Sequence, residues 1–332
     1  MKNLIKSRLF HSALGISVSV ILLGWILAVT DWPVVFRMLA QINYLVLIPV
    51  TLLMLGHYFL RAWRWRYFLP GGRSVAIRRL FDALMVGNFA TFILPLRAGE
   101  FVRPYLLTRY SEHSFSTGFV SIIVERFFDL LVVLASFGVV VLFVPNIPAW
   151  ANRGALLLCL LAFCIFVLML VGTFVPQMVL KRADFFVRFL PAGWRAGTRK
   201  FIEDFLAGAA VLSRGGGLFK VVLLSLAVWI SCYVIFHVFF FLCRMPPDWW
   251  VSVTAAVIIA LAVAAPSAPG FLGVYQTACV ASFALFGRSA ETAVAYSIVV
   301  HGYQYILFVA YGMYVLLRDN LKLSELHRPN GK

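Results

Sequence analysis

The chain passes repeatedly through stretches of about 20 apolar residues, which is the length a helix needs to cross the roughly 30 Å hydrocarbon core of a bilayer. Such runs lie near residues 12–29, 43–62, 118–144, 154–175, 218–243 and 293–317. Hydrophobic residues make up 62% of the chain and charged residues only 13%, which leaves no room for a sizeable soluble domain. The pattern predicts an all-α polytopic membrane protein, with six full transmembrane helices in a single membrane domain over residues 1–332.

Basic residues are distributed unevenly between the loops. Few follow the first, third and fifth runs, whereas six arginines crowd the segment after the second: Arg61, Arg64, Arg66, Arg73, Arg78 and Arg79. By the positive-inside rule this segment is cytoplasmic, which predicts a plasma (inner) membrane protein with both termini in the cytoplasm. The net charge of +16 lies largely in such loops, so a nucleic-acid partner is not expected.

Two further apolar stretches are interrupted and do not fit simple spans. Residues 80–96 have arginines on both sides, so they are expected to enter from the cytoplasm and return. Residues 249–287 are broken by the uncharged sequence APSAPGFLG and are expected to form a second re-entrant hairpin from the outer side. The residues expected to break these helices are Pro95, Gly99, Pro266, Pro269, Gly270 and Gly273. Irregular backbone at membrane depth must be buried in protein or line a cavity, so a cavity between the hairpins is predicted.

The order of these elements predicts an inverted repeat, an architecture typical of transporters that work by alternating access. Residues 1–150 give span, span, hairpin from inside and span; residues 151–332 give the same order with the opposite starting direction. Between the second half's first two spans, residues 176–217 combine basic residues with apolar pairs. This segment is interpreted as a cytoplasmic amphipathic hairpin, attracted to anionic lipid or serving only as an anchor.

Ionisable residues inside these apolar stretches are the candidate site, because a charge at mid-membrane needs a partner or a cavity. The candidates are Asn88, Arg97, Glu100, Arg103, Glu125, Arg126, Asp129 and Gln276, with Arg61 and Arg64. Arginines near Glu100 could exchange it for an anionic headgroup, or form an interfacial salt-bridge set. Glu125 and Asp129 could relay protons or lock helices together, and Arg61 and Arg64 could simply anchor the chain at the interface.

Neither a metal site nor a cofactor is indicated by the sequence. The five cysteines (Cys159, Cys164, Cys232, Cys243 and Cys279) lie in or next to apolar runs and lack the paired spacing of metal ligands or a disulfide framework. There is also no nucleotide-sugar motif and no nucleophile paired with a base. We therefore expect no cofactor, no metal and no enzymatic activity.

Four motifs follow one another along the chain: RAWRWR at residues 61–66, NFATFILPLRAGEFVR at 88–103, ERFFD at 125–129 and PSAPGFLGVYQ at 266–276. In this combination the sequence closely resembles the transmembrane region of the lysylphosphatidylglycerol synthase family over nearly its whole length. That broad family also takes in the flippase half of the multiple peptide resistance factor, dolichol-related archaeal proteins and a hopanoid-cluster membrane protein.

The resemblance implies a flippase that moves a phospholipid or isoprenoid-type lipid between leaflets, with the two hairpins meeting at its cavity. It implies roles for the residues of the four motifs, and its candidate substrates are anionic phospholipid, polyprenyl-linked lipid and hopanoid. Where the family often has a glutamate this chain has Gln276, which puts proton coupling through that position in doubt. The chain ends at Lys332 without a soluble aminoacyl-transferase domain, so synthesis of lysyl-lipid is not expected.

Two other functions fit the same residues. An intramembrane lipid-modifying enzyme would use Glu100 or Asp129 as a general base. A non-catalytic membrane partner of a lipid-synthesis enzyme would need none of the cavity residues. The sequence leaves the lipid, the direction of movement and the oligomeric state open.

Overall fold

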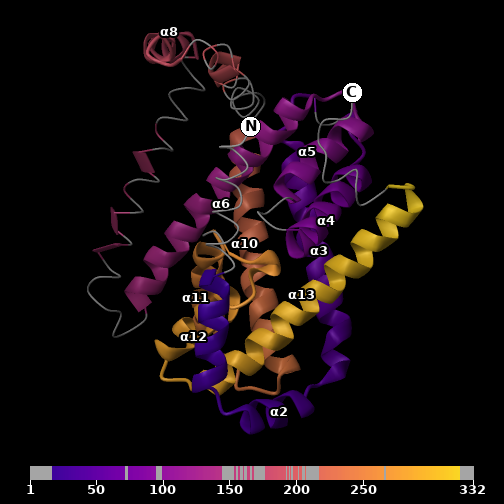
Figure 1. The fold of residues 1–332 in the computed structure, drawn as a ribbon, viewed down its shortest axis with the longest axis vertical. Helices are drawn as coiled ribbons and strands as arrows, with labels where there is room; N and C mark the ends of the chain where they lie inside the picture. Colours follow the sequence, from indigo (N-terminus) through magenta and orange to yellow (C-terminus); the bar gives the residue numbers. More distant parts are fainter. Residues whose placement is uncertain are drawn as a thin grey trace.

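The computed structural model describes residues 17–71, 74–94, 99–143, 176–191, 217–264 and 267–321, together with scattered positions between 153 and 206. These residues are α-helical with short 3-10 turns and contain no strand, which confirms the all-α fold class (Figure 1). Three helical segments are long and apolar enough to cross a bilayer, namely Tyr44–Arg66, Gly217–Leu242 and Ala290–Arg318. A fourth is the bent pair Ser17–Val29 and Trp32–Ala40. The described residues contain three to four candidate spans, so the six spans and the inverted repeat stay predictions.

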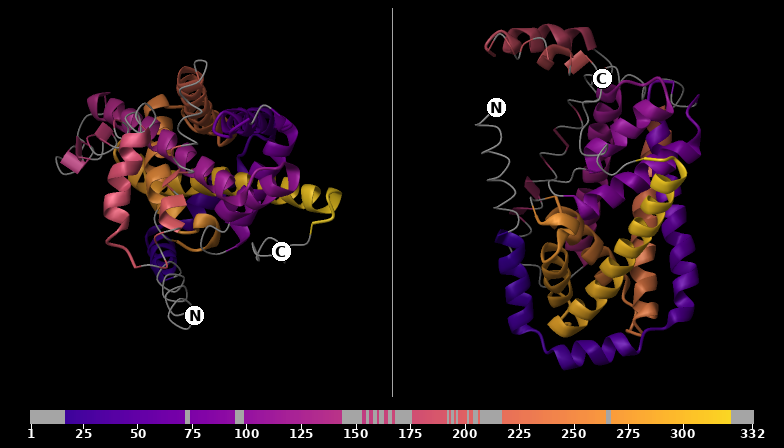
Figure 2. Two further views of the ribbon diagram at one scale, coloured as in Figure 1. Left: turned by 90° about the horizontal axis from the view of Figure 1, so that it is seen from above. Right: turned by 45° about the vertical axis from the view of Figure 1, so that its right-hand side comes forward.

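The first span is followed by a sharp turn that the hydropathy pattern did not predict. Helix α2 (Trp32–Ala40) is bent by 89° from the helix before it and lies across one end of the bundle (Figure 2). Asp31 caps α2 by accepting a hydrogen bond of 3.4 Å from the backbone N–H of Val34, and proline occupies its first turn. A capping carboxylate and a proline both favour a helix start here, which explains the turn.

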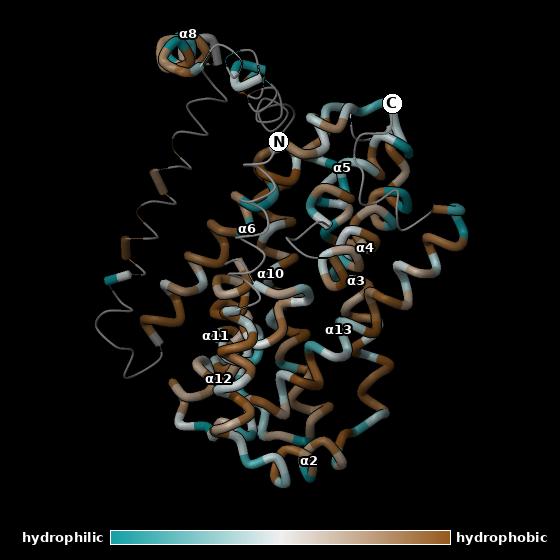
Figure 3. The backbone as a smooth tube through the Cα atoms, viewed as in Figure 1, coloured by the Kyte–Doolittle hydropathy of each residue, from teal (hydrophilic) through white to brown (hydrophobic). Residues whose placement is uncertain are grey.

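The long helices form the frame of the bundle. Helix α3 (Leu47–Arg66) follows a 3-10 turn at Tyr44–Val46, and α6 (Phe115–Phe143), α10 (Gly217–Leu242) and α13 (Ala290–Arg318) cross beside it. Hydrophobic residues run along these helices, and hydrophilic residues gather towards the ends of the molecule (Figure 3). Because α6 begins at Phe115, Glu125 lies almost three turns inside it rather than at its start.

Two shorter helices, α4 (Ile77–Ile93) and α5 (Gly99–Tyr110), lie on either side of the predicted first break. Pro95 and Arg97 are outside the described residues. Where the two helices cross, Gly87 and Gly99 bring their backbones into contact: a Cβ on Gly99 would lie 1.8 Å from the carbonyl oxygen of Gly87. Only two glycines allow such an approach, which fixes the angle of the α4–α5 hairpin.

The second interrupted stretch forms α11 (Trp249–Ala262), a 3-10 turn at Pro269–Phe271 and α12 (Val274–Ala284). Gly270 and Gly273 have φ of 67° and 82°, a region that only glycine adopts readily. Pro266 is outside the described residues. The tips of the two hairpins meet, since the ring of Phe92 lies 6.1 Å from the ring of Phe271 and a Cβ on Gly270 would lie 3.1 Å from the carbonyl oxygen of Phe92.

An ionic cluster joins the start of α4 to the ends of α5 and α13. Arg318 donates a 2.7 Å hydrogen bond to the fully buried Asp82, and Asp319 accepts bonds from Tyr110 at 2.8 Å and Arg79 at 2.9 Å. Hydrogen bonds from Arg318 are the main reason that the pKa of Asp319 falls to about 2, so its carboxylate is ionised at neutral pH. The segment after α3 and the end of α13 therefore share one end of the molecule.

Helix α8 (Pro176–Val187) stands apart from the bundle, beyond the same end (Figure 1). It and the turn that follows carry Lys181, Arg182 and Arg188 beside the exposed rings of Phe185 and Phe189. The amphipathic hairpin over residues 176–217 stays a prediction, because most of residues 192–216 lie outside the described part of the chain.

Candidate functional site

A cavity of about 210 Å³, partly open to the outside, lies where the hairpin tips meet. Its wall is divided by chemistry. The side built from α3, α4, α5 and α6 is polar and cationic, with Tyr58, Arg61, Asn88, Thr91, Glu100, Arg103 and Arg126. The side built from α10, α11, the 3-10 turn and α13 is mainly apolar, with Phe236, Ala256, Ile259, Ala260, Val263, Phe271 and Phe308.

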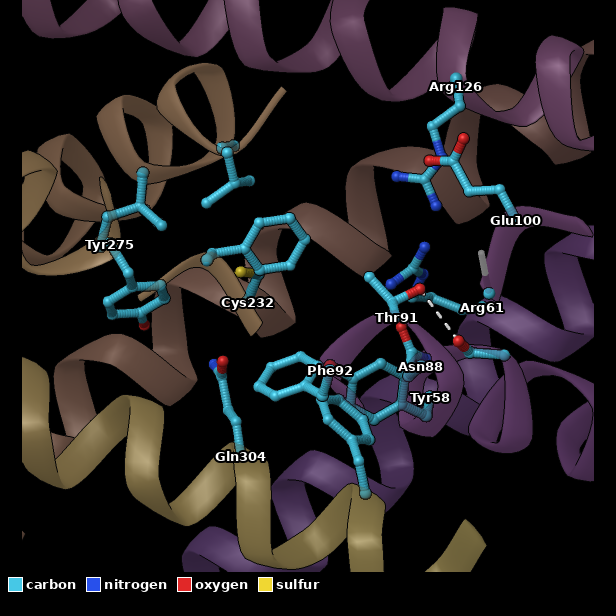
Figure 4. A pocket seen from close by; sticks show the side chains of 18 of the residues that line it. Tyr58, Arg61, Asn88, Thr91, Phe92, Glu100, Arg126, Cys232, Tyr275 and Gln304 are labelled. Carbon is cyan, nitrogen blue, oxygen red and sulfur yellow. Dashed lines mark hydrogen bonds between the residues drawn. The ribbon is translucent and has the colours of Figure 1, made fainter. Parts of the chain in front are cut away.

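The arrangement can be followed in the close view (Figure 4), where Arg61, Glu100 and Arg126 extend into one side of the cavity, and Tyr275 and Gln304 into the other. On α4, the side chains of Asn88 and Thr91 donate hydrogen bonds to backbone carbonyls of their own helix. Asn88 donates to the carbonyl of Leu84 at 3.0 Å, and Thr91 to that of Gly87 at 3.0 Å. The guanidinium groups therefore dominate the electrostatics of the polar side.

Behind the cavity wall, the fully buried carboxylate of Glu125 joins three helices. Arg103 of α5 donates to it at 2.7 Å and Arg61 of α3 at 3.0 Å, and the guanidinium of Arg64 lies 3.4 Å away. Buried ion pairs of this kind keep their charges only because each carboxylate oxygen is engaged. Glu125 thus fixes the direction in which Arg61 and Arg103 face the cavity.

The neighbouring carboxylate, Asp129, is one helical turn further along α6. It lies 2.7 Å from the guanidinium of Arg64 and accepts a 3.2 Å hydrogen bond from the indole of Trp229 on α10. Arg64 also donates to Ser225 at 3.1 Å and is fully buried. The anchoring role considered for Arg61 and Arg64 is therefore not what the structure shows, because both side chains turn inward to carboxylates instead of outward to an interface.

Arg103 is held on both flanks. Its guanidinium lies 4.4 Å from the ring centroid of Trp65, and its Cγ would be 2.4 Å from a Cβ on Gly87. Trp65 is itself fixed, since its indole donates a 2.8 Å hydrogen bond to Ser121 of α6. The glycine creates the space that this arginine fills, and the tryptophan adds a cation–π contact.

The structure places Gln276 away from the cavity wall. Its side-chain oxygen accepts a 2.9 Å hydrogen bond from the backbone N–H of Gly273, and its amide lies 3.2 Å from Nδ1 of His301. The ring of His301 in turn stacks on Tyr275, with centroids 4.3 Å apart. Gln276 caps the start of α12 and links it to α13, and Tyr275 beside it is the residue that reaches the cavity.

Of the remaining candidates, Asn88, Gly99, Glu100, Arg103, Arg61 and Arg126 line the cavity, and Glu125, Arg64 and Asp129 support its wall. Sequence reasoning missed Tyr58, Thr91, Trp229, Cys232, Gln304 and the α11 residues. The α11 residues carry a readable signal, because Ala256, Ile259, Ala260 and Val263 follow the i, i+3, i+4, i+7 spacing of one helix face.

Nothing in the described part of the chain gathers three or more His, Cys, Asp or Glu side chains in a way that could hold a metal ion. Glu125 and Asp129 are engaged by arginines instead. The chemistry that the site offers is the binding of an anion next to an apolar surface.

The comparisons with known proteins agree with this picture. The family model described as the lysylphosphatidylglycerol synthase TM region matches residues 12–312. No match was found among curated proteins or among solved structures. The family match covers most of the chain and the helices of the structure suit a bilayer, so the protein is an integral membrane protein. The resemblance carried by the four motifs is confirmed: the chain belongs to the lysylphosphatidylglycerol synthase transmembrane-region family.

Proposed function

We propose that the protein is a lipid transporter, or flippase, that moves a phospholipid or isoprenoid-type lipid between the leaflets of the inner membrane. The observation that carries the proposal is the divided cavity: guanidinium groups face an apolar wall across one space at the meeting point of two helical hairpins. A lipid has the same division between its headgroup and its tails. Membership of a lipid-related membrane family supports the same function.

In this mechanism the headgroup occupies the polar side near Arg61 and Arg103, and the tails lie along α11 or remain in the bilayer. The cavity provides counter-charge for a group that would otherwise cross hydrocarbon at a cost of several kcal/mol. The hairpin tips meet beside it, so a rocking movement of one hairpin against the other would expose the cavity to alternate leaflets. No bond is made or broken in this cycle, and the protein acts without enzymatic chemistry.

The proposed orientation places both termini in the cytoplasm. The ion pair between Arg79 and Asp319 brings the arginine-rich segment after α3 to the same end as the end of α13. Helix α8, with its basic residues, lies beyond this end as well. A shared basic end is what the positive-inside rule assigns to the cytoplasmic side.

A bulky residue inside the cavity is expected to stop transport without unfolding the protein. Ala260 lines the apolar wall and is partly exposed, so Ala260→Trp fills space that the lipid needs. Transbilayer movement of headgroup-labelled phospholipid in proteoliposomes should fall at least tenfold, as expected for a site that loses about 1.4 kcal/mol or more of lipid binding.

The matched control is Ala310→Trp, which adds the same side chain to an exposed face of α13. It should move lipid at the wild-type rate. Equal rates in both variants and wild type would contradict passage through this cavity. A wild-type rate no higher than that of empty liposomes, with phospholipid and with isoprenoid lipid, would favour an enzyme or a partner protein.

A further inference from the structure

Arg126 differs from the other three arginines around Glu125 in its exposure. The side chains of Arg61, Arg64 and Arg103 are 13%, 0% and 4% exposed, whereas that of Arg126 is 43% exposed. Its distances to carboxylates are also the longest of the cluster, at 3.7 Å to Glu125 and 3.6 Å to Asp129. Both distances exceed hydrogen-bond length, so these contacts leave its donors available to a ligand.

Arg126 also stands between two cavities. It lines the main cavity and a second one of about 160 Å³, which lies between α3, α6 and α10. His57, Asp129 and Val228 line the second cavity alone, and it shares Tyr58, Arg61, Trp229 and Cys232 with the first. A group that moves from the second cavity to the first therefore passes between these shared side chains, and Arg126 and Arg61 are the two cations among them.

The surroundings of the second cavity are suited to a lipid. One turn along α6 from Arg126, Leu130 is exposed, and on α10 Leu226 is exposed one turn before Trp229. Apolar side chains thus border the cationic group on both helices. A lipid whose headgroup lies at Arg126 can keep its tails on these apolar surfaces.

Among the described residues, arginines outnumber carboxylates in this region. Four guanidinium groups, of Arg61, Arg64, Arg103 and Arg126, stand with three carboxylates, of Glu100, Glu125 and Asp129. The buried arginines are paired with Glu125 and Asp129 at 3.4 Å or less. Arg126 is the most exposed of the four guanidinium groups, and one phosphate diester bound there would balance the excess positive charge.

We propose that Arg126 binds the phosphate of an anionic phospholipid headgroup, and that the headgroup enters the main cavity from the second cavity between α6 and α10. This inference rests on the proposed function and narrows it to a phosphate-bearing lipid and a lateral route. Asp129 and Trp229 border that route, and their mutual hydrogen bond of 3.2 Å joins α6 to α10 beside it.

The test measures equilibrium binding of short-chain phosphatidylglycerol to the purified full chain in detergent. Arg126→Gln should weaken this binding about tenfold or more, because a charge-assisted bidentate contact is lost. Arg126→Lys keeps the charge but loses the bidentate contact, so its affinity should lie between those of wild type and Arg126→Gln. Arg37→Gln removes an exposed guanidinium of α2 outside both cavities and should have no effect. Short-chain diacylglycerol, which lacks the phosphate, should bind wild type and Arg126→Gln equally.

Unchanged phosphatidylglycerol binding in Arg126→Gln would overturn the proposal, as would an equal loss of both lipids. Binding of glycerol 3-phosphate as tight as that of the lipid would show a soluble phosphate ligand, which also overturns it. Because binding is measured without transport, this result is separate from the proposed function. If wild type moves no lipid but Arg126→Gln weakens phosphatidylglycerol binding, the binding site is supported and the transport proposal is contradicted.

Discussion

Replacing Glu125 with glutamine is expected to destabilise the folded protein by about 3–5 kcal/mol, the range measured when one partner of a buried ion pair is removed. The carboxylate is fully buried and lies within 3.4 Å of Arg61, Arg64 and Arg103, which come from two other helices. Without its charge these three guanidinium groups would repel one another in a region with little water. The effect is measured by thermal unfolding in detergent, with the remaining fraction of monodisperse protein as the readout.

Glu112→Gln is the matched control, because Glu112 is exposed in the turn before α6. Its effect should stay within about 0.5 kcal/mol, as for most surface substitutions. A Glu125→Gln protein as stable as the control would show that the arginines do not depend on this carboxylate. The assignment of Glu125 as the centre of the cavity wall would then be wrong.

The second large effect is expected for Gly99→Ala. Its Cβ would lie 1.8 Å from the backbone oxygen of Gly87 and 2.1 Å from the hydroxyl oxygen of Thr91, so α4 and α5 would have to separate. Overpacking in protein interiors destabilises by about 1–3 kcal/mol, and a clash with backbone belongs at the upper end. Glu100 and Arg103 follow Gly99 on α5 and line the cavity, so separating the helices displaces both residues. The rate of lipid movement per folded protein should therefore fall as well. Thermal unfolding and transport in proteoliposomes measure the two effects.

Gly56→Ala provides the comparison within α3. A Cβ there has no atom within 4 Å, and alanine in a helix interior is favoured over glycine by about 0.5–1 kcal/mol. We expect this variant to be as stable as wild type or slightly more so. If Gly99→Ala behaved in the same way, the close approach of the two helices would not be a requirement of the fold.

Hydropathy predicted the long helices well because each is a single apolar run. Residues 43–62, 218–243 and 293–317 correspond to helical segments at Tyr44–Arg66, Gly217–Leu242 and Ala290–Arg318. The right-angled α2 was missed, although Asp31 and the following proline are a helix-start signal. A helix of nine residues between two apolar runs is too short to be recognised as a span, so only its cap could have revealed it. The predicted fourth run, residues 154–175, falls mostly outside the described residues.

The motifs identified most polar residues of the site but not their roles. Spacing along a helix shows which side chains share a face, but it cannot show which face meets which neighbour. Arg64 and Asp129 are 65 positions apart, and their ion pair depends on how α3 crosses α6. The apolar wall from α11 was missed for a related reason. A helix face of small apolar residues has the same composition whether it faces lipid, protein or a cavity.

The most direct test of lipid passage through this cavity uses Cys232, which lines both the main and the second cavity. Transbilayer movement of labelled phospholipid would be measured in proteoliposomes of a variant that retains Cys232 and replaces the other cysteines with serine. The same sample would be measured before and after attachment of a bulky group through a disulfide, and again after reduction. We predict that modification stops the movement and reduction restores it. An unchanged rate after complete modification would contradict the account.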